Sequence, residues 1–440
     1  MENLRIDTAN FVVRERYLGA IEAFIDRPVV KVLKGMRRVG KSVIMRLLIE
    51  RLINSGVPGA NILYFNKESF EFDAVKDYRD LYRYAGDYFK DGVVATGRKY
   101  ILIDEIQEIE GWERAVASFL ADGLGDVVIS GSNASLLSSE LATLISGRYV
   151  EIPVYPLTFS EFLTFRKDKK DKRDKAGKEA YLEAHPKADE AVDTETEFKN
   201  YLRYGGLPGI HQLPSNDEVI FSYLNSILNT VLYKDVITRH KIRDASIFDK
   251  LVRYLFDNVG NITTAKKIAD YFKSQRIRTS VDTVLNYINY VEESLLIDKV
   301  PRYDIKGRKL LEFFDKVFLN DIGLRHGLIG YRERDINGLL ENIVFKELQA
   351  RGYKMSIGVI DQMEIDFIAE KQGDRKYIQV CYSLGSEAAV EREFGNLEKI
   401  KDNYEKIVIS MDRFFPAERN GIIHRYVIDF LLGENKTLKG

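Results

Sequence analysis

Residues 35–42 read Gly-Met-Arg-Arg-Val-Gly-Lys-Ser. This stretch matches the G-x-x-x-x-G-K-S spacing of a phosphate-binding loop. An apolar run at residues 29–33 precedes it, and residues 43–52 follow with the apolar periodicity of a helix, so the order is strand, glycine-rich turn and helix. Gly35 and Gly40 allow the turn to point its backbone N–H groups at phosphate oxygens. The stretch therefore predicts an α/β fold that binds a nucleoside triphosphate.

The residues of this loop have separate expected tasks. Lys41 is expected to reach the β- and γ-phosphates of ATP, and the hydroxyl of Ser42 to hold Mg²⁺. The helix that begins near Lys41 adds the positive end of its dipole. We expect nucleotide contacts at Gly35, Arg38, Val39, Gly40, Lys41, Ser42 and Val43. The alternative is a chance glycine-rich turn, and the flanking strand and helix argue against it.

A second apolar run ends in two carboxylates. Residues 100–105 read Tyr-Ile-Leu-Ile-Asp-Glu, and such a run is typical of a strand buried on both faces of a parallel sheet. Ligands of open α/β sheets bind at the C-terminal ends of the strands. Asp104 is therefore expected to hold Mg²⁺, and Glu105 to orient and deprotonate the attacking water. Acidic pairs are also common at strand ends on surfaces, so this interpretation depends on the phosphate loop.

A third apolar run, residues 127–129, leads into Ser-Gly-Ser-Asn at residues 130–133. Asn133 is a candidate for a hydrogen bond to the γ-phosphate or to the attacking water. The alternative is a turn that caps the next helix. The catalytic interpretation requires this strand to lie beside the other two.

Composition sets the limits for the whole chain. With 440 residues, 45% hydrophobic and 30% charged, we expect a soluble protein of more than one domain. No apolar stretch is long enough for a membrane span, and the N-terminus resembles no signal segment, so a cytoplasmic location is expected. The single cysteine, Cys381, excludes an internal disulfide, and the five histidines are scattered. A net charge of −1 gives no overall attraction to nucleic acid.

The first part of the chain alternates strand-like and helix-like segments. We expect a P-loop ATPase core with a parallel sheet at residues 1–165, a charged insertion at 166–198 and a helical lid or linker at 199–245. Residues 166–178 contain eight Lys or Arg and three Asp. This run is interpreted as a solvated segment, and a contact with nucleic acid or an acidic partner is the alternative.

Residues 246–325 have the pattern of a winged helix. Three helical segments are followed by two strand-like runs around residues 304–308, which is the order of a winged helix-turn-helix. If this module binds double-stranded DNA, the helix near 279–293 enters the major groove. The cations available are Arg276, Arg278, Lys306, Arg308 and Lys309. Winged helices also bind proteins, so an unknown protein partner is the alternative.

Residues 335–440 are expected to form a small α/β domain of the restriction-endonuclease-like type. PD-(D/E)xK nucleases place a Glu on a helix, an Asp on a strand and a Glu-x-Lys on the next strand, where they hold Mg²⁺. The matching positions here are Glu341, Asp366 and residues 379–381, which read Gln-Val-Cys. Gln is a poor replacement for a carboxylate, and Cys does not supply the cation, so the layout is expected without the full chemistry.

Taken together, these parts resemble a prokaryotic family of AAA+-like ATPases in which a phosphate-loop domain precedes a C-terminal domain of unknown function. The segments that resemble it are residues 35–42, 100–107, 130–133, 146–149, 156–162, 204–208, 319–323 and 378–381. The resemblance implies ATP as the nucleotide, a helical lid, a winged helix and a degenerate nuclease-like domain. It also implies that Arg148 is an arginine finger, which can act from a neighbouring subunit; a surface ion pair is the alternative. Arg203 is a candidate for a second sensor residue.

Three hypotheses follow from the sequence. The first is a Mg²⁺-dependent ATPase whose nucleotide state (ATP or ADP) acts on a partner through the winged helix. Both a monomer and an oligomer are compatible with this hypothesis. No membrane partner is expected. The second is an ATP-regulated DNA-binding switch with slow hydrolysis. The third is an ATP-gated nuclease that depends on Asp366.

Overall fold

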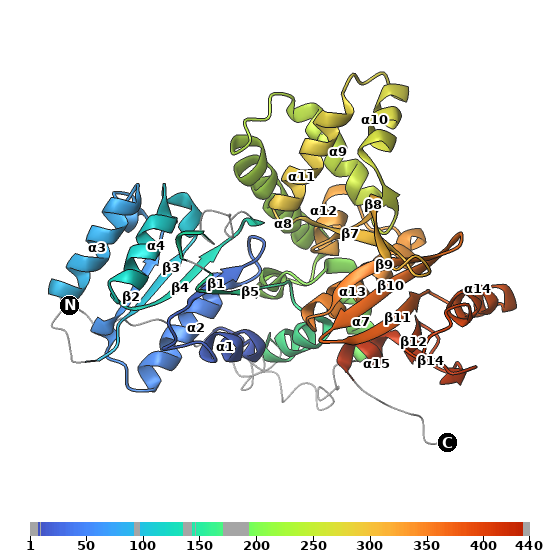
Figure 1. Ribbon diagram of the computed structural model, residues 1–440, viewed down its shortest axis with the longest axis horizontal. Coiled ribbons are helices and arrows are strands. Elements are labelled where there is room, and N and C mark those ends of the chain that lie inside the picture. Colours follow the sequence, from blue (N-terminus) through green and yellow to red (C-terminus); the bar gives the residue numbers. More distant parts are fainter. Residues whose placement is uncertain are drawn as a thin grey trace, which may run out of the picture. The chain divides into compact units, whose positions relative to one another are not determined.

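The computed structural model describes residues 8, 10–91, 97–134, 143–145, 147–169 and 193–433. These residues form two compact units (Figure 1). The first unit extends to Tyr155 and includes Glu293–Leu295, and the second consists of Pro156–Glu292 and the chain from Leu296 onward. Among the described residues, no helix has the length and apolar character needed to cross a bilayer.

A five-stranded sheet forms the centre of the first unit. Its strands are β1 (Val30–Lys34), β2 (Ile62–Asn66), β3 (Tyr100–Asp104), β4 (Asp126–Gly131) and β5 (Tyr149–Pro153). The order across the sheet is β2-β3-β4-β1-β5, and every neighbouring pair is parallel. The parallel α/β core expected from the sequence is confirmed. The three central strands, β3, β4 and β1, are buried along almost their whole length, and most of their residues are apolar because both faces of such a sheet are covered.

Helices cover this sheet. They are α1 (Glu15–Glu22), α2 (Lys41–Asn54), α3 (Tyr78–Asp91) and α4 (Trp112–Ala121), with short 3₁₀ turns at Gly59–Asn61, Phe70–Phe72 and Ile106–Glu108. The apolar sides of α3 and α4 pack on one another and on alternate strand residues such as Val32, Phe65 and Ile103. Helix α1 packs on α2 and on β5, and α2 contacts β3 and β4. This packing fixes α2, and therefore the loop before it, against the end of β1.

The second unit begins with helices. The helices are α7 (Thr194–Tyr204), α8 (Asp217–Thr230), α9 (Ala245–Asp257), α10 (Ala265–Ser274), α11 (Val281–Glu293) and α12 (Ile322–Ile329), with a 3₁₀ turn at Pro208–Gln212 and a π-helical turn at Val231–Thr238. Two buried contacts join α7 and the residues just after it to α12 and its N-cap, across a long stretch of sequence. The backbone N–H of Gly206 donates to the Asp321 carboxylate at 2.7 Å, and a ring nitrogen of His326 lies 3.2 Å from the Leu202 carbonyl oxygen.

A nine-stranded sheet forms the rest of the second unit, in the order β13-β14-β12-β11-β10-β9-β7-β8-β6. The strands are β6 (Ile262–Thr263), β7 (Ile297–Asp304), β8 (Lys309–Leu319), β9 (Lys354–Ile360), β10 (Met363–Lys371), β11 (Asp374–Val380), β12 (Glu405–Ser410), β13 (Glu418–Arg419) and β14 (Ile422–Tyr426). The helices of this part are α13 (Ile336–Ala350), α14 (Glu387–Glu398) and α15 (Val427–Leu432), after a 3₁₀ turn at Glu333–Asp335.

The β7–β8 hairpin belongs to this large sheet. Residues 302–304 of β7 pair in parallel with residues 357–359 of β9, so the hairpin of the expected winged helix and the strands of the expected nuclease-like domain share one sheet. The sequence pattern indicates where strands lie but not which strands pair with one another, so it did not predict the pairing of β7 with β9. The domain boundaries given above stay predictions. Most of the expected charged insertion, residues 170–192, lies outside the described residues.

Candidate nucleotide-binding site

The three loops expected to form the site lie at one edge of the first sheet. The C-terminal ends of parallel strands share an edge, and β4 lies between β1 and β3. The phosphate loop follows β1, Glu105 follows β3 and Asn133 follows β4. A hydrogen bond from the Glu105 N–H to Oγ of Ser130, 3.3 Å long, joins the ends of β3 and β4. The adjacency that the catalytic interpretation of Asn133 required is therefore present.

The conformation of the phosphate loop depends on its two glycines. A Cβ at Gly35 would lie 2.2 Å from the carbonyl oxygen of Val154, and Gly40 has φ of +100°, a region that favours glycine. Arg38 is exposed and also has a positive φ, +66°. Helix α2 starts at Lys41, so the loop amides and the helix N-terminus face the same space.

Lys41 is almost fully buried and faces the loop that precedes it. Its Nζ donates to the carbonyl oxygens of Gly35 at 2.9 Å and Met36 at 3.2 Å. The same nitrogen lies 3.4 Å from Oε1 of Glu105. The ammonium group therefore connects the phosphate loop to the acidic end of β3.

Glu105 is buried and in the left-handed region, with φ of +55°. Its Oε2 accepts hydrogen bonds from Nε2 of Gln107 at 2.5 Å and from Oγ of Ser132 at 3.0 Å. Burial alone raises the pKa of Glu105, but the charge of Lys41 and these hydrogen bonds outweigh burial, and the pKa lies below its usual value. The side chain is therefore a carboxylate at neutral pH, the form that can accept a proton.

Asp104 is held by groups on both neighbouring strands. Oγ of Ser130 on β4 donates to Oδ1 of Asp104, and the Tyr64 hydroxyl on β2 lies 3.4 Å from Oδ2. Burial, followed by the charge of Asp104, raises the pKa of Tyr64 to about 12, so the phenol stays protonated. A fixed carboxylate at the strand end and the Ser42 hydroxyl at the start of α2 are oxygen ligands of the kind that Mg²⁺ prefers. The residues present fit this ion.

Arg14, which the sequence analysis did not single out, braces the phosphate loop. Its guanidinium donates to the carbonyl oxygen of Val39 at 2.9 Å and to that of Tyr155 at 3.0 Å, and it lies 4.4 Å from the centre of the Tyr17 ring. Arg14 is buried. No local motif marks this residue, because its partners lie 25 and 141 residues away in the sequence.

The remaining predicted residues lie in different places. Asn133 is buried at the site edge, Val39 is buried and Val43 is half-buried. Arg148 is exposed and precedes β5, and its carbonyl oxygen accepts a hydrogen bond from Val30 at the start of β1. It therefore lies where the strands begin, whereas the phosphate loop lies where they end. The length of β1, roughly 15 Å, separates the two, so Arg148 is not part of the site in its own chain.

Arg203 lies in the second unit, where it pairs with Asp217 and its guanidinium lies 5.4 Å from the centre of the Tyr331 ring. Its role as a second sensor stays a prediction. The arginine-finger role of Arg148, from a second copy of the chain, also stays a prediction.

Comparison with known proteins gives the family. The family model described as an AAA domain matches residues 27–163, and a domain of unknown function (DUF8612) matches residues 195–335. An uncharacterized protein of Haemophilus influenzae is 37% identical over 427 residues, which are 96% of this chain and 98% of that protein. This chain belongs to the same family. An uncharacterized protein of Methanocaldococcus jannaschii is 27% identical over 85% of this chain and 79% of its own length.

Three similar solved structures are those of named proteins. Cdc6p of Pyrobaculum aerophilum has a TM-score of 0.31 and 14% identity, over 67% of this chain and 91% of that chain. The RuvB Holliday junction branch migration motor of Thermotoga maritima has a TM-score of 0.32 and 15% identity, over 69% of this chain and 93% of that chain. AMPPCP-bound DnaA of Aquifex aeolicus has a TM-score of 0.30 and 14% identity, over 65% of this chain and 91% of that chain. At these scores the three similarities assign no role to this family member.

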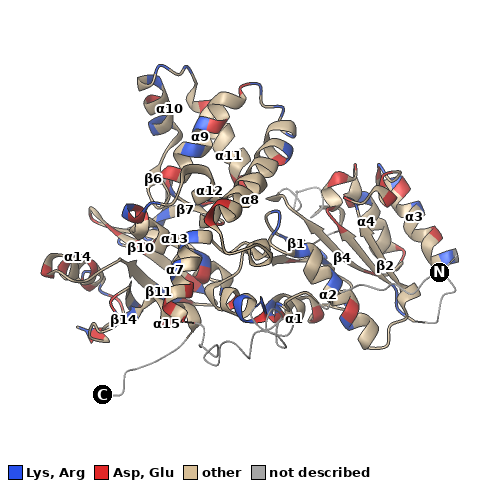
Figure 2. Ribbon diagram, turned by 180° about the vertical axis from the view of Figure 1, so that it is seen from behind, with Lys and Arg blue, Asp and Glu red and all other residues tan. Residues whose placement is uncertain are grey.

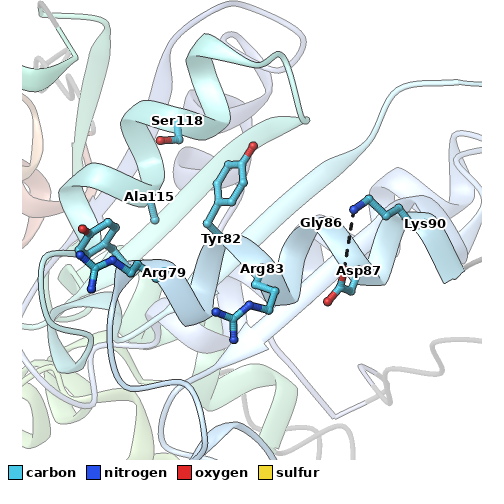
Figure 3. A pocket seen from close by; sticks show the side chains of 9 residues that line it. Arg79, Tyr82, Arg83, Gly86, Asp87, Lys90, Ala115 and Ser118 are labelled. Atoms are coloured by element: carbon cyan, nitrogen blue, oxygen red, sulfur yellow. Dashed lines mark ion pairs between the residues drawn. The ribbon is translucent and has the colours of Figure 1, made fainter.

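A groove elsewhere in the AAA domain is separate from this site (Figure 3). It has a volume of about 450 Å³ and runs along α3 and α4. Its lining includes Tyr82, Arg83 and Lys90. Two of the cations along it pair within α3, Lys90 with Asp87 at 3.9 Å and Arg83 with Asp80 at 3.8 Å. The groove shares no residue with the phosphate loop.

The second unit contains the residues expected of a nuclease-like site, and it adds a lysine that the sequence analysis missed. Nζ of Lys316, on β8, lies 2.9 Å from Glu341, 2.8 Å from Glu364 and 3.6 Å from Asp366. Burial and the charge of Glu341 raise the pKa of Asp366 well above its usual value. Lys316 thus supplies a positive charge that Cys381, whose pKa burial raises to about 12, does not.

The amide of Gln379 completes this cluster. Its Oε1 accepts the backbone N–H of Asp366 at 2.7 Å, and its Nε2 donates to Glu393 at 3.1 Å. Within the described part of the chain, no group of three His, Cys, Asp or Glu residues is arranged to hold a metal ion. The carboxylates here lie against the Lys316 ammonium and the Gln379 amide. This arrangement adds no support to the nuclease hypothesis.

Proposed function

We propose that this chain is a Mg²⁺-dependent ATPase. The observation that supports the proposal is the contact between Lys41 and Glu105, 3.4 Å apart, beside a complete phosphate loop. A phosphate-binding ammonium and a buried carboxylate base lie next to each other where three parallel strands end. Hydrolysis needs both groups at one place.

The proposed roles are those expected from the sequence. The loop amides and Lys41 hold the β- and γ-phosphates, and Glu105 accepts the proton of the attacking water. Asn133 is expected to contact the γ-phosphate. Ser42 and Asp104 are the residues that would hold Mg²⁺, which neutralises charge on the phosphate oxygens when it is bound.

We also propose that turnover requires a second copy of the chain. Arg148 precedes β5, at the edge of the sheet where strands begin, so it cannot reach the phosphate loop of its own chain. An arginine that stabilises the transferred phosphoryl group can be supplied in trans. Turnover per chain that rises with protein concentration in the wild type, but not in Arg148→Ala, supports this step.

ATP turnover of the purified chain tests the main proposal. Phosphate release is measured with Mg²⁺, with EDTA, and with Lys41→Ala and Glu105→Gln as controls, in the presence and absence of double-stranded DNA. Release that depends on Mg²⁺ and is lost in both variants supports an ATPase. Release at the wild-type rate by either variant contradicts the assignment. Stimulation by DNA indicates that nucleotide state is coupled to DNA, and indifference to DNA indicates a protein partner.

The second candidate is an ATP-regulated DNA-binding switch. The observation that favours it is a set of exposed cations at the turn between α10 and α11 and at the β7–β8 turn, namely Arg276, Arg278, Lys306, Arg308 and Lys309. Acidic residues lie among the cations on α9 and α10 (Figure 2), and Lys306 pairs with Asp361 at 2.6 Å, which weakens the attraction. DNA affinity that falls with salt and differs between ATP and ADP supports the switch.

A further inference from the structure

Gln107 lies two residues after Glu105, in the 3₁₀ turn Ile106–Glu108. Its Nε2 donates to Oε2 of Glu105 at 2.5 Å and lies 3.4 Å from Oγ of Ser132. The Oε1 atom at the other end of the amide is buried and has no hydrogen-bond partner among the described residues. An acceptor next to the proposed catalytic base therefore lacks a donor.

The orientation of this amide follows from chemistry. An ionised carboxylate only accepts hydrogen bonds, so the NH₂ group of Gln107 is the part that contacts Glu105, and Oε1 is left to accept from another donor. A buried acceptor without a partner costs about 1–3 kcal/mol. Such an atom is a candidate for a partner that arrives during the reaction, and the proposed reaction brings in a water molecule at this place.

Both carboxylate oxygens of Glu105 are in contact with neighbouring side chains. Oε1 of Glu105 faces Lys41 at 3.4 Å, and Oε2 accepts from Gln107 and from Ser132 at 3.0 Å. Gln107 and Ser132 thus hold the carboxylate from two loops, those after β3 and β4. Because Gln107 uses Nε2 for this purpose, its Oε1 is fixed in direction as well.

We propose that Gln107 is a catalytic residue of the ATPase, an inference that rests on the proposed function. Its Oε1 accepts a hydrogen bond from one hydrogen of the attacking water, and Glu105 accepts the other hydrogen as a proton. The water oxygen forms a bond to the γ-phosphorus, and the bond from the γ-phosphorus to the β,γ-bridging oxygen breaks. ADP leaves with the electron pair of that bond, and the products are ADP and inorganic phosphate. Two fixed acceptors orient the water lone pair toward phosphorus, as a water-positioning glutamine does in other phosphoryl-transfer enzymes.

The test separates catalysis from nucleotide binding. For Gln107→Ala and the apolar, similarly sized Gln107→Met, we measure kcat, KM, the Kd of the ATP analogue AMPPNP with Mg²⁺, and the Kd of ADP with fluoroaluminate. We expect kcat to fall about 10²-fold, with AMPPNP affinity within about twofold of wild type and fluoroaluminate affinity reduced by the same factor as kcat. Gln275→Ala, an exposed glutamine of the second unit, is the control and is expected to keep wild-type turnover.

The outcomes distinguish this inference from the proposed function. If the wild type releases phosphate and Glu105→Gln does not, but both Gln107 variants keep kcat within about threefold of wild type, the inference is overturned and the ATPase remains. If AMPPNP affinity falls as much as kcat in both folded variants, Gln107 only shapes the binding site and the inference is again overturned. If the wild type binds nucleotide without turnover in any condition, the proposed function is wrong, and the inference, which rests on it, is wrong as well.

Discussion

Nζ of Lys41 lies 3.4 Å from Oε1 of Glu105, and both side chains are buried, with 3% and 8% of their surfaces exposed. In this arrangement the two charges neutralise each other. A γ-phosphate held by Lys41 would bring a competing negative charge next to Glu105. In the proposed function, Glu105 and a bound phosphate would therefore compete for one ammonium group, and nucleotide binding would be coupled to the position of the Glu105 side chain.

The substitution Lys41→Ala is expected to abolish nucleotide binding. It removes the ammonium that faces the phosphates and leaves the buried Glu105 carboxylate without its counter-charge, a change that costs several kcal/mol. Titration with a fluorescent ATP analogue measures the affinity, and the fluorescence of Trp112, the single tryptophan of the chain, reports the unfolding of the first unit. Lys90→Ala, at a side chain that is 78% exposed, is the matched control. Binding by Lys41→Ala at the affinity of this control would contradict the assignment.

The substitution Glu105→Gln is expected to separate binding from hydrolysis. The amide keeps the shape of the side chain and its contacts with Gln107 and Ser132, but it cannot accept a proton. ATP should therefore bind about as tightly as in the wild type, and kcat should fall by about 10²–10⁴-fold. Stopped assays of phosphate release and equilibrium binding give the two quantities. Loss of binding together with turnover would mean that Glu105 positions the nucleotide and is not the base.

The sequence predicted the positions of those candidate site residues that directly follow a strand in the chain. The phosphate loop, Asp104 and Glu105 each follow an apolar strand directly, and parallel strands must end at one edge, so their meeting could be foreseen. Arg14 and Lys316 could not be foreseen, because their partners are distant in sequence and come together only through packing. Lys316 reaches Asp366 because β8 belongs to the same sheet as β10, a join that depends on the pairing of β7 with β9.

The substitution Arg14→Ala is expected to weaken nucleotide binding about tenfold and to destabilise the first unit. Arg14 donates to the carbonyl oxygens of Val39, in the phosphate loop, and of Tyr155, and its removal leaves the buried Val39 acceptor and the partly buried Tyr155 acceptor without this donor. Each lost hydrogen bond from a charged group costs about 1.5–3 kcal/mol. Arg14→Lys keeps the charge but loses the forked geometry, so it should restore only part of the affinity. Urea unfolding followed by Trp112 fluorescence and analogue binding test this; wild-type values for Arg14→Ala would show that the loop holds its shape unaided.

His211 makes the stability of the second unit depend on pH. Its ring lies 4.7 Å from the ring of Phe162 and 5.4 Å from that of Phe165, and neither of its nitrogens has a hydrogen-bond partner among the described residues. Burial, with smaller effects from the charges of Arg166 and Lys169, lowers the pKa of His211 from 6.5 to about 3. The folded chain therefore keeps this ring neutral, while the unfolded chain binds a proton below pH 6.5.

The sign of the effect follows from linkage. Between pH 6.5 and 3 the unfolded state binds more protons than the folded state, so the free energy of unfolding falls as pH falls. At pH 5 the loss from this one group is about 2 kcal/mol relative to neutral pH. His326 and His424, whose pKa values burial also lowers to about 4, add to the same trend, so a single variant is needed to isolate the effect of His211.

The substitution His211→Phe is expected to remove this part of the pH dependence. Phenylalanine fits the aromatic surroundings and introduces no titrating group, so the difference in unfolding free energy between pH 7 and pH 5 should shrink by about 2 kcal/mol. Urea unfolding followed by far-ultraviolet circular dichroism at the two pH values measures this difference, and Trp112 fluorescence follows the first unit in the same samples. The change should appear in the circular dichroism transition alone. Equal pH dependence in wild type and variant would show that the folded chain accommodates a protonated His211.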